Sequence, residues 1–173
     1  MRLEDLGLIG NCQFSALVDR GGSVVWSCLP RFDSEPVFSS LLDAESGGRF
    51  TVAPESGEAG TQSYIENTNV LETRFETKAG SFRVLDFAPR FVQFDRIFRP
   101  TQIFRIVEPL SGTPRISVSC EPRNGWAKTA PDRVTGSNHV RFEGFAQHLR
   151  LTSDVPVSYL GGQPFALTAQ KHL

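Results

Sequence analysis

The sequence predicts an all-β protein, an antiparallel β-sandwich with one short helix near residues 34–43. Two observations predict this class. Short runs rich in Val, Ile, Phe and Thr recur along the chain, and Gly, Pro, Asn or Asp residues separate them. Over residues 69–77, apolar and polar side chains alternate with the period of two that a half-exposed strand shows. Many short strands with few helical segments are typical of sandwiches.

The first two strands are expected to form a hairpin. Residues 14–18 and 24–28 are β-prone, and the segment between them contains Gly21 and Gly22, whose backbones permit positive φ. The run at 69–77 leads through a Lys-Ala-Gly turn into a second strand at 82–87. Further strands are predicted at residues 102–108, 115–120, 139–143, 148–152 and 165–168.

The helix is predicted from a cap and a spacing. Ser34 can cap a first turn that contains Glu35 and Pro36, and the two glycines at 47 and 48 can end the helix. Between them, apolar residues recur at positions i, i+1, i+4 and i+5, which lie on one helix face: Val37, Phe38, Leu41 and Leu42.

Three segments interrupt the strand pattern. Residues 53–63 and 123–138 are rich in small and polar residues and are predicted to be long surface loops. Residues 90–99 interleave arginines with aromatic residues, as single-strand nucleic-acid binders do. Because the chain as a whole is not basic, we expect an exposed loop or an interface with another domain instead.

Composition excludes several classes of function. The chain has 173 residues and a formal net charge of −1, which argues against nucleic-acid and anionic-membrane partners. No apolar run is long enough to span a membrane, and the N-terminus lacks the features of a signal peptide, so a cytoplasmic protein is expected. The three cysteines and three histidines show no metal-ligand spacing, so we expect no metal, no cofactor and reduced core thiols.

The densest candidate site lies at residues 26–34, where a strand end meets a proline-fixed turn. Trp26 could stack on a sugar ring while Arg31 and Asp33 bind hydroxyl groups. The simpler interpretation is that Asp33 or Ser34 caps the helix and the aromatic residues are core. The candidate residues for a pocket edge or a domain interface are Trp26, Pro30, Arg31, Phe32 and Asp33.

Four stretches carry a family resemblance. Residues 9–18, 22–38, 67–75 and 84–90, taken in order, resemble the start of bacterial glycoside hydrolase family 15 proteins, the glucoamylase-like and trehalase-like enzymes. Together they lie within residues 9–90, about half of the chain, and four stretches in the same order are more specific than any single motif. Beyond residue 99 the likeness is reduced to the strand pattern and a Leu-Ser-Gly at 110–112.

The resemblance implies that residues 1–173 are one N-terminal β-sandwich domain without a catalytic residue. A catalytic (α/α)6 barrel is then expected after Leu173, and the strand-like end of the chain without a polar tail agrees with this. The full-length enzyme would hydrolyse an α-glucosidic bond by inversion, with its own C-terminal catalytic domain and the α-glucoside as this domain's partners. Arg31 and Asp33 would face the barrel near its pocket, with Trp26 and Phe32 packed beneath them.

Two other functions stay open at this point. The chain could be a stand-alone carbohydrate-binding module, for which the polar-edged aromatic residues are Trp26, Trp126, Tyr64 and Tyr159. It could also be a protein-interaction sandwich with no enzyme attached. The sequence beyond Leu173 would decide between these readings.

Overall fold

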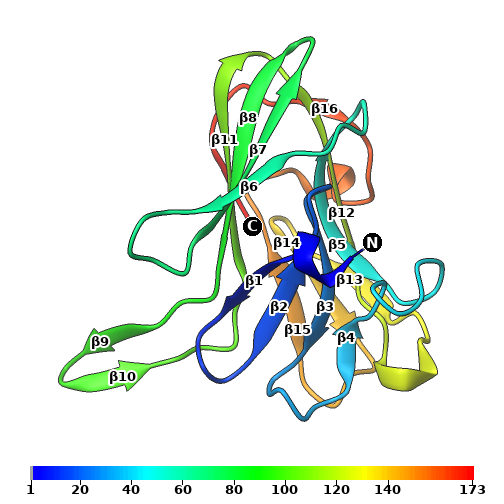
Figure 1. Ribbon diagram of the computed structural model, residues 1–173. Coiled ribbons are helices and arrows are strands. Elements are labelled where there is room, and N and C mark those ends of the chain that lie inside the picture. The colour runs from blue at the N-terminus through cyan, green and yellow to red at the C-terminus, as the bar shows by residue number, and fades with distance from the viewer. Residues whose placement is uncertain (1) are drawn as a thin grey trace.

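The computed structural model describes residues 2–173 and shows two main antiparallel sheets packed on one core (Figure 1). The seven-stranded sheet has the order β1-β2-β3-β5-β12-β16, with β4 paired to β3. Its strands are β1 Gly7–Gly10, β2 Ser15–Val18, β3 Ser23–Cys28, β4 Pro36–Phe38, β5 Arg49–Pro54, β12 Arg115–Glu121 and β16 Phe165–Ala166. The five-stranded sheet has the order β17-β11-β8-β7-β6. Its strands are β6 Thr61–Tyr64, β7 Leu71–Thr77, β8 Gly80–Phe87, β11 Phe104–Gly112 and β17 Lys171–His172.

Two smaller sheets complete the fold. Strands β13 Asp132–Thr135, β14 His139–Glu143 and β15 Leu149–Thr152 form one of them, and Val140, Phe142 and Leu151 add to the same apolar core. Strands β9 Phe91–Gln93 and β10 Arg96–Phe98 pair only with each other. The described residues contain three 3-10 turns, η1 Leu3–Asp5, η2 Gly125–Ala127 and η3 Val157–Tyr159, and none of their helices could cross a membrane.

The predicted all-β class is confirmed, and so are the local hairpins. Strand β2 pairs antiparallel with β3, and β7 with β8. On β7 the side chains of Leu71, Thr73 and Phe75 are buried while Arg74 and Glu76 are exposed, as the alternation predicted. The hairpin adds a stacked aromatic pair to the core, since the ring of Phe75 lies against a second buried phenylalanine of β8 with their centroids 4.8 Å apart.

The predicted helix at residues 34–43 is wrong. Its first half is strand β4, whose three residues are all buried and whose Phe38 pairs with Ser27 of β3. The second half is a compact turn in which the amide of Ser39 donates to the carbonyl of Gly47. The physical reason is burial: Val37 and Phe38 are both inside, whereas Leu42 is 67% exposed, so the apolar residues do not share one helical face.

The two predicted long loops are shorter than expected. The first contains β6, an edge strand with largely exposed polar side chains, and the second contains η2 and β13. A strand at a sheet edge needs no continuous apolar pattern, so these strands could not be predicted from the composition of the two segments. The expectation of core thiols holds for Cys28 and Cys120, and burial raises the pKa of Cys120 to about 12. It is wrong for Cys12, which is exposed in a turn.

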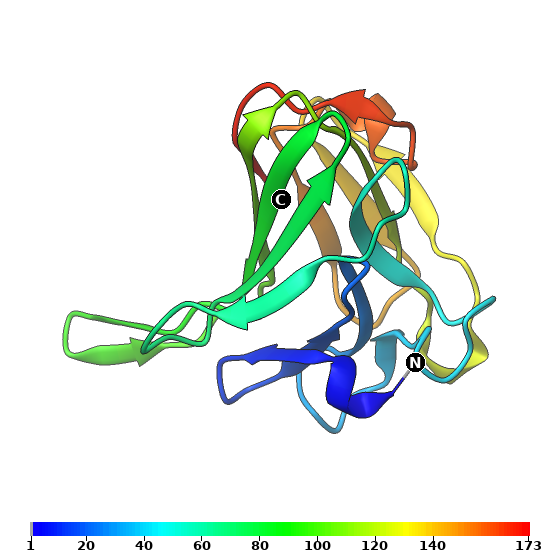
Figure 2. The same ribbon diagram turned by 45° about the horizontal axis from the view of Figure 1, so that its top comes forward.

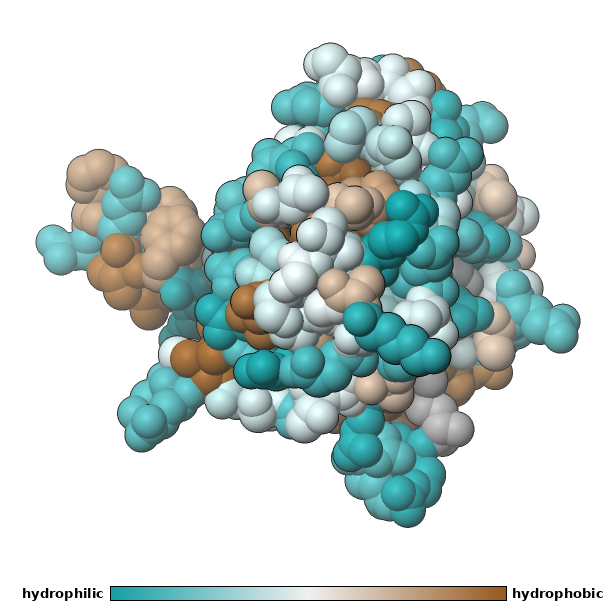
Figure 3. Space-filling model, turned by 90° about the horizontal axis from the view of Figure 1, so that it is seen from above, coloured by the Kyte–Doolittle hydropathy of each residue, from teal (hydrophilic) through white to brown (hydrophobic). Residues whose placement is uncertain are grey.

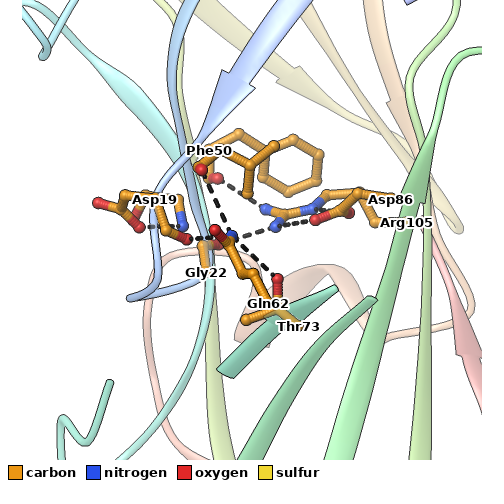
Figure 4. Close-up of polar contacts among 9 residues, drawn as sticks. Asp19, Gly22, Phe50, Gln62, Thr73, Asp86 and Arg105 are labelled. Carbon is orange, nitrogen blue, oxygen red and sulfur yellow. Dashed lines mark hydrogen bonds and ion pairs between the residues drawn. The ribbon is translucent and has the colours of Figure 1, made fainter. Parts of the chain in front are cut away.

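A buried ion pair within the five-stranded sheet also contacts the other main sheet across the core (Figure 4). Asp86 of β8 accepts from Nε and Nη2 of Arg105 of β11, at 2.8 and 3.1 Å, and both side chains are fully buried. The same guanidinium donates to the carbonyls of Phe50 and Gly22 on the opposite sheet, at 2.7 and 2.8 Å. Its five-donor geometry therefore holds the two layers in register.

A second set of hydrogen bonds lies beside this ion pair. Gln62 of β6 donates to the carbonyls of Val18 and Asp19 and to the hydroxyl of Thr73 (Figure 4). The carboxylate of Asp19 accepts from the amide of Ser23, at 2.8 Å, and thereby closes the β2–β3 turn. Burial raises the pKa of Asp19, an effect that the amides of the turn and Arg105 oppose.

Candidate functional site

The turn after β3 brings three of the predicted site residues to one exposed surface. Arg31, Phe32 and Asp33 line a shallow hollow of about 590 Å³ at one end of the sandwich. The remaining lining residues are Cys12 and Gln13, from the β1–β2 turn, and Arg99, which follows β10. We call this surface of six residues the loop end.

The charged pair of the loop end is held in a fixed geometry. Arg31 donates from Nε and Nη2 to the two carboxylate oxygens of Asp33, at 3.0 and 3.3 Å. This hydrogen bond is the main cause that lowers the pKa of Asp33. Ser34 does not cap a helix; its hydroxyl accepts from the amide of Arg31, at 3.2 Å, and closes the turn. Both charged side chains nevertheless remain about 70% exposed, so their outer edges are free to meet a partner.

The aromatic residues do not lie where the sequence predicted them. Phe32 is not packed beneath Arg31 and Asp33 but is itself 59% exposed. Trp26, half-buried on β3, lies against Trp126 of η2, with ring centroids 6.2 Å apart. Pro30 is half-buried and follows a cis peptide bond. Three of the five candidate residues therefore lie exposed at the loop end, whereas Pro30 is half-buried before them and Trp26 packs separately against Trp126.

The loop end continues into a projecting β-hairpin. Strands β9 and β10 and the turn between them, Phe91–Phe98, stand away from both sheets in two views (Figures 1 and 2). We call this segment the hairpin arm. Seen from above, it is a separate lobe that carries much apolar surface (Figure 3). Every residue of its two strands is exposed.

One buried asparagine fixes the base of the hairpin arm. The amide nitrogen of Asn11 donates to the carbonyls of Pro89 and Pro100, at 3.1 and 2.9 Å, and so holds both ends of the segment together. Gln13 adds a hydrogen bond to the hydroxyl of Thr101, at 3.1 Å. These contacts join the arm directly to the loop end, and sequence reasoning missed them, because an asparagine between short strands is equally typical of any turn.

The turn of the hairpin arm is strained. Phe94 and Asp95 are the two central residues of a two-residue turn and have φ of 51° and 57°. Such a turn favours Asn and Gly, because a side chain in the left-handed region costs about 1–2 kcal/mol. Phe94 is also 84% exposed, the highest value among the exposed large apolar residues.

The described residues offer few other candidate sites. Among residues 2–173, no group of three or more His, Cys, Asp or Glu side chains is arranged to hold a metal ion. A mainly apolar cavity of about 290 Å³ opens between the strands, with Phe104, Leu149 and Leu173 among its lining residues and the paired Asp154 and His172 at its wall.

The chain is similar to the amino-terminal part of trehalases. A family model described as trehalase-like, N-terminal, matches residues 1–159. The chain belongs to this trehalase-like N-terminal family. The resemblance seen in the sequence is thereby confirmed at the level of the trehalase-like domain.

The relatives are longer proteins. A trehalase of Thermoplasma volcanium is 32% identical over 160 residues, which cover 90% of this chain and 25% of that protein. Trehalase 1 of Sulfolobus acidocaldarius is 44% identical over 88 residues, 50% of this chain and 15% of the relative. A trehalase of Mycolicibacterium smegmatis is 31% identical over 134 residues, which cover 69% of this chain and 20% of that protein. The chain thus spans a quarter or less of these curated relatives, and no solved structure gives a significant match.

Proposed function

We propose that this chain is the non-catalytic N-terminal domain of a trehalase-type glycosidase, and that the catalytic domain follows Leu173 in the same protein. The family membership and the curated relatives, all trehalases that extend far beyond the matched region, support this proposal. The single observation that carries it is the match of the trehalase-like, N-terminal family to residues 1–159.

The reaction of the full-length protein is the hydrolysis of an α-glucosidic bond, with trehalose as the first candidate substrate. As in glycoside hydrolase family 15, an (α/α)6 barrel would supply two carboxyl groups for inversion, which requires a separation of roughly 6.5–9.5 Å to admit a water molecule. The protein would work in the cytoplasm. Its three free cysteines, two of them buried, fit a reducing compartment.

Within that protein, the loop end is the surface that meets the catalytic domain. Arg31 and Asp33 form an exposed, geometrically fixed pair beside the exposed ring of Phe32. A ring with that exposure next to a charged pair is typical of an interface, where an apolar anchor is surrounded by polar groups. We assign Arg31 and Asp33 to the edge of the catalytic pocket, and Pro30 to the positioning of their turn.

Arg31→Ala in the full-length protein tests this role. We expect kcat/KM for trehalose to fall about three- to tenfold, which corresponds to about 0.7–1.4 kcal/mol. The melting temperature of residues 1–173 should stay the same, because both members of the pair are exposed. Arg74→Ala is the matched control, since Arg74 also forms an exposed ion pair with an acid two residues further on, Glu76 of β7. Unchanged activity in Arg31→Ala would refute the pocket-edge role.

The tryptophan pair favours a second candidate function, carbohydrate binding by the domain itself. Trp126 is 59% exposed and lies against Trp26, and these are the only two tryptophans of the chain. Their fluorescence therefore reports directly on any sugar that stacks there. Titration of residues 1–173 with trehalose and maltooligosaccharides, with Trp126→Ala as the control, decides this. A saturable change that the variant lacks would favour the binding module.

A further inference from the structure

We propose that the hairpin arm is a docking arm that inserts into an apolar groove with an acidic rim on the catalytic domain of the same protein. The inference rests on the proposed function, because the groove belongs to the domain assigned there. It goes beyond the loop end, since the arm is a separate element with its own apolar residues and its own anchoring at the base.

The distribution of side chains indicates insertion rather than contact on one face. Phe91 and Phe98 are a cross-strand pair whose rings stack with their centroids 5.5 Å apart. Val92 and Ile97 are the next pair of the ladder, so they point to the opposite face. Because both faces of the arm are apolar and exposed, a flat surface would cover only one of them. A groove with two walls covers both.

The arm has little stability of its own, because a lone two-stranded hairpin is at best marginally stable in water. Its ladder joins three residue pairs and receives no strand from either main sheet. Its turn holds the exposed Phe94 in a left-handed conformation. A strained aromatic residue at the tip of an uncovered ribbon is the arrangement expected when a partner supplies the missing burial.

Two observations indicate that the catalytic domain is the partner of the arm: the arm is attached to the loop end, and its segment is positively charged. Asn11 and Gln13 attach the base of the arm to the loop end, so a domain that covers the loop end also reaches the arm. Arg90, Arg96 and Arg99 accompany a single acid, Asp95, over residues 90–99, which leaves this segment with a positive charge of two. The walls of the groove should therefore carry carboxylates at their rim. The trehalase relatives have more than enough additional chain to form such a domain.

Photo-cross-linking in the full-length protein tests the insertion. A benzophenone amino acid is placed at Val92 or at Phe91, which lie on opposite faces of the arm, and at Leu110 as a control in β11, outside the arm. We expect cross-links from Val92 and Phe91 to residues beyond Leu173 of the same molecule, and none from Leu110. Cross-links from one face only, cross-linked dimers or no cross-links would each overturn the proposal.

Substitution of the two turn residues, followed by amide hydrogen exchange, gives an independent test. The double variant F94N/D95G installs the residues that the turn favours, so the arm of residues 1–173 should keep or increase its amide protection. In the full-length protein, the wild-type arm should exchange at least tenfold more slowly than in residues 1–173, and this difference should be smaller in the variant, which lacks the exposed ring of Phe94. Equal exchange of the wild-type arm in both proteins would overturn the proposal.

The two proposals fail separately. Trehalose hydrolysis is assayed on the full-length protein before cross-linking. Hydrolysis without cross-links from the arm overturns the docking arm alone. Cross-links from both faces without hydrolysis overturn the proposed reaction and leave the arm docked on the rest of the chain.

Discussion

Arg105 and Asp86 are a charged pair at positions where the strand pattern predicts apolar residues. On β8, Asp86 follows Phe82 and Val84 on the inward register, and on β11, Arg105 precedes Val107. The period of two in the sequence therefore contained a signal for both residues, because the alternation assigns them to the core. It could not show that they meet, since strand pairing across 19 residues is a property of the fold.

Removal of either charge from this pair should be strongly destabilising. Asp86→Asn leaves a buried guanidinium without its counter-charge, so we expect the free energy of unfolding to fall by about 3–5 kcal/mol. Urea denaturation of the chain measures this. The control is Glu76→Gln, which breaks an exposed pair with Arg74 and should cost at most about 1 kcal/mol. A loss of similar size in both variants would contradict the structural role of the buried pair.

Asp43 makes stability depend on pH. It accepts hydrogen bonds from Nζ of Lys128, at 2.7 Å, and from Ser46 and Glu45, and the bond from Lys128 is the largest cause that lowers its pKa far below the usual range. Because the folded pKa lies below the unfolded one, the stabilisation is complete above pH about 4 and is lost as pH falls through the folded pKa.

Asp43→Asn should therefore lower stability at pH 7, and the difference from wild type should shrink as pH falls below about 4. Urea denaturation at pH 7, 4 and 2.5 measures this difference. Asp132→Asn, at an exposed carboxylate on β13, is the control and should leave the free energy of unfolding at pH 7 within about 0.5 kcal/mol of wild type. A constant difference over the three pH values would show that the carboxylate charge of Asp43 is not the cause.

At the scale of elements, hairpins were predictable and the segment at residues 34–43 was not. The β2–β3 and β7–β8 hairpins are specified locally by alternating side chains and short turns. Strand β4 is specified instead by contacts remote in sequence, such as the amide of Arg123 donating to the carbonyl of Val37. A strand followed by a turn can imitate the apolar spacing of a short helix over so few residues.

The hairpin arm could also be predicted only in part from local sequence. The sequence indicated that residues 90–99 form an exposed element, but its direction depends on Asn11, which lies 78 residues before Pro89. Asn11→Asp turns two hydrogen bonds into contacts between a carboxylate and carbonyl oxygens, so we expect a loss of about 1–3 kcal/mol. Faster amide exchange in the arm should accompany it.

Gln13→Glu is the matched control for that prediction, because the hydroxyl of Thr101 can donate to a carboxylate in place of accepting from the amide. It should leave the melting temperature and the amide exchange of the arm unchanged. If Asn11→Asp behaves like this control, the buried asparagine does not anchor the arm.

For the whole molecule, the class of the fold could be predicted and the pairing of its sheets could not. The adjacency of β5 and β12 joins residues that lie more than 60 positions apart, and no local pattern reports it. For the candidate residues, the exposure of Arg31 and Asp33 could be predicted from their turn, and their role stays a prediction. The positions of Trp26 and Phe32 follow from tertiary packing.

The most direct test of the account compares glucose release from trehalose by the full-length protein and by residues 1–173. The account predicts that the full-length protein releases glucose from trehalose, with the anomeric inversion expected for two carboxyl groups and a water molecule. It predicts no release by residues 1–173. Release by residues 1–173 that one Asp or Glu substitution abolishes would contradict the account, and so would a full-length protein that leaves trehalose intact.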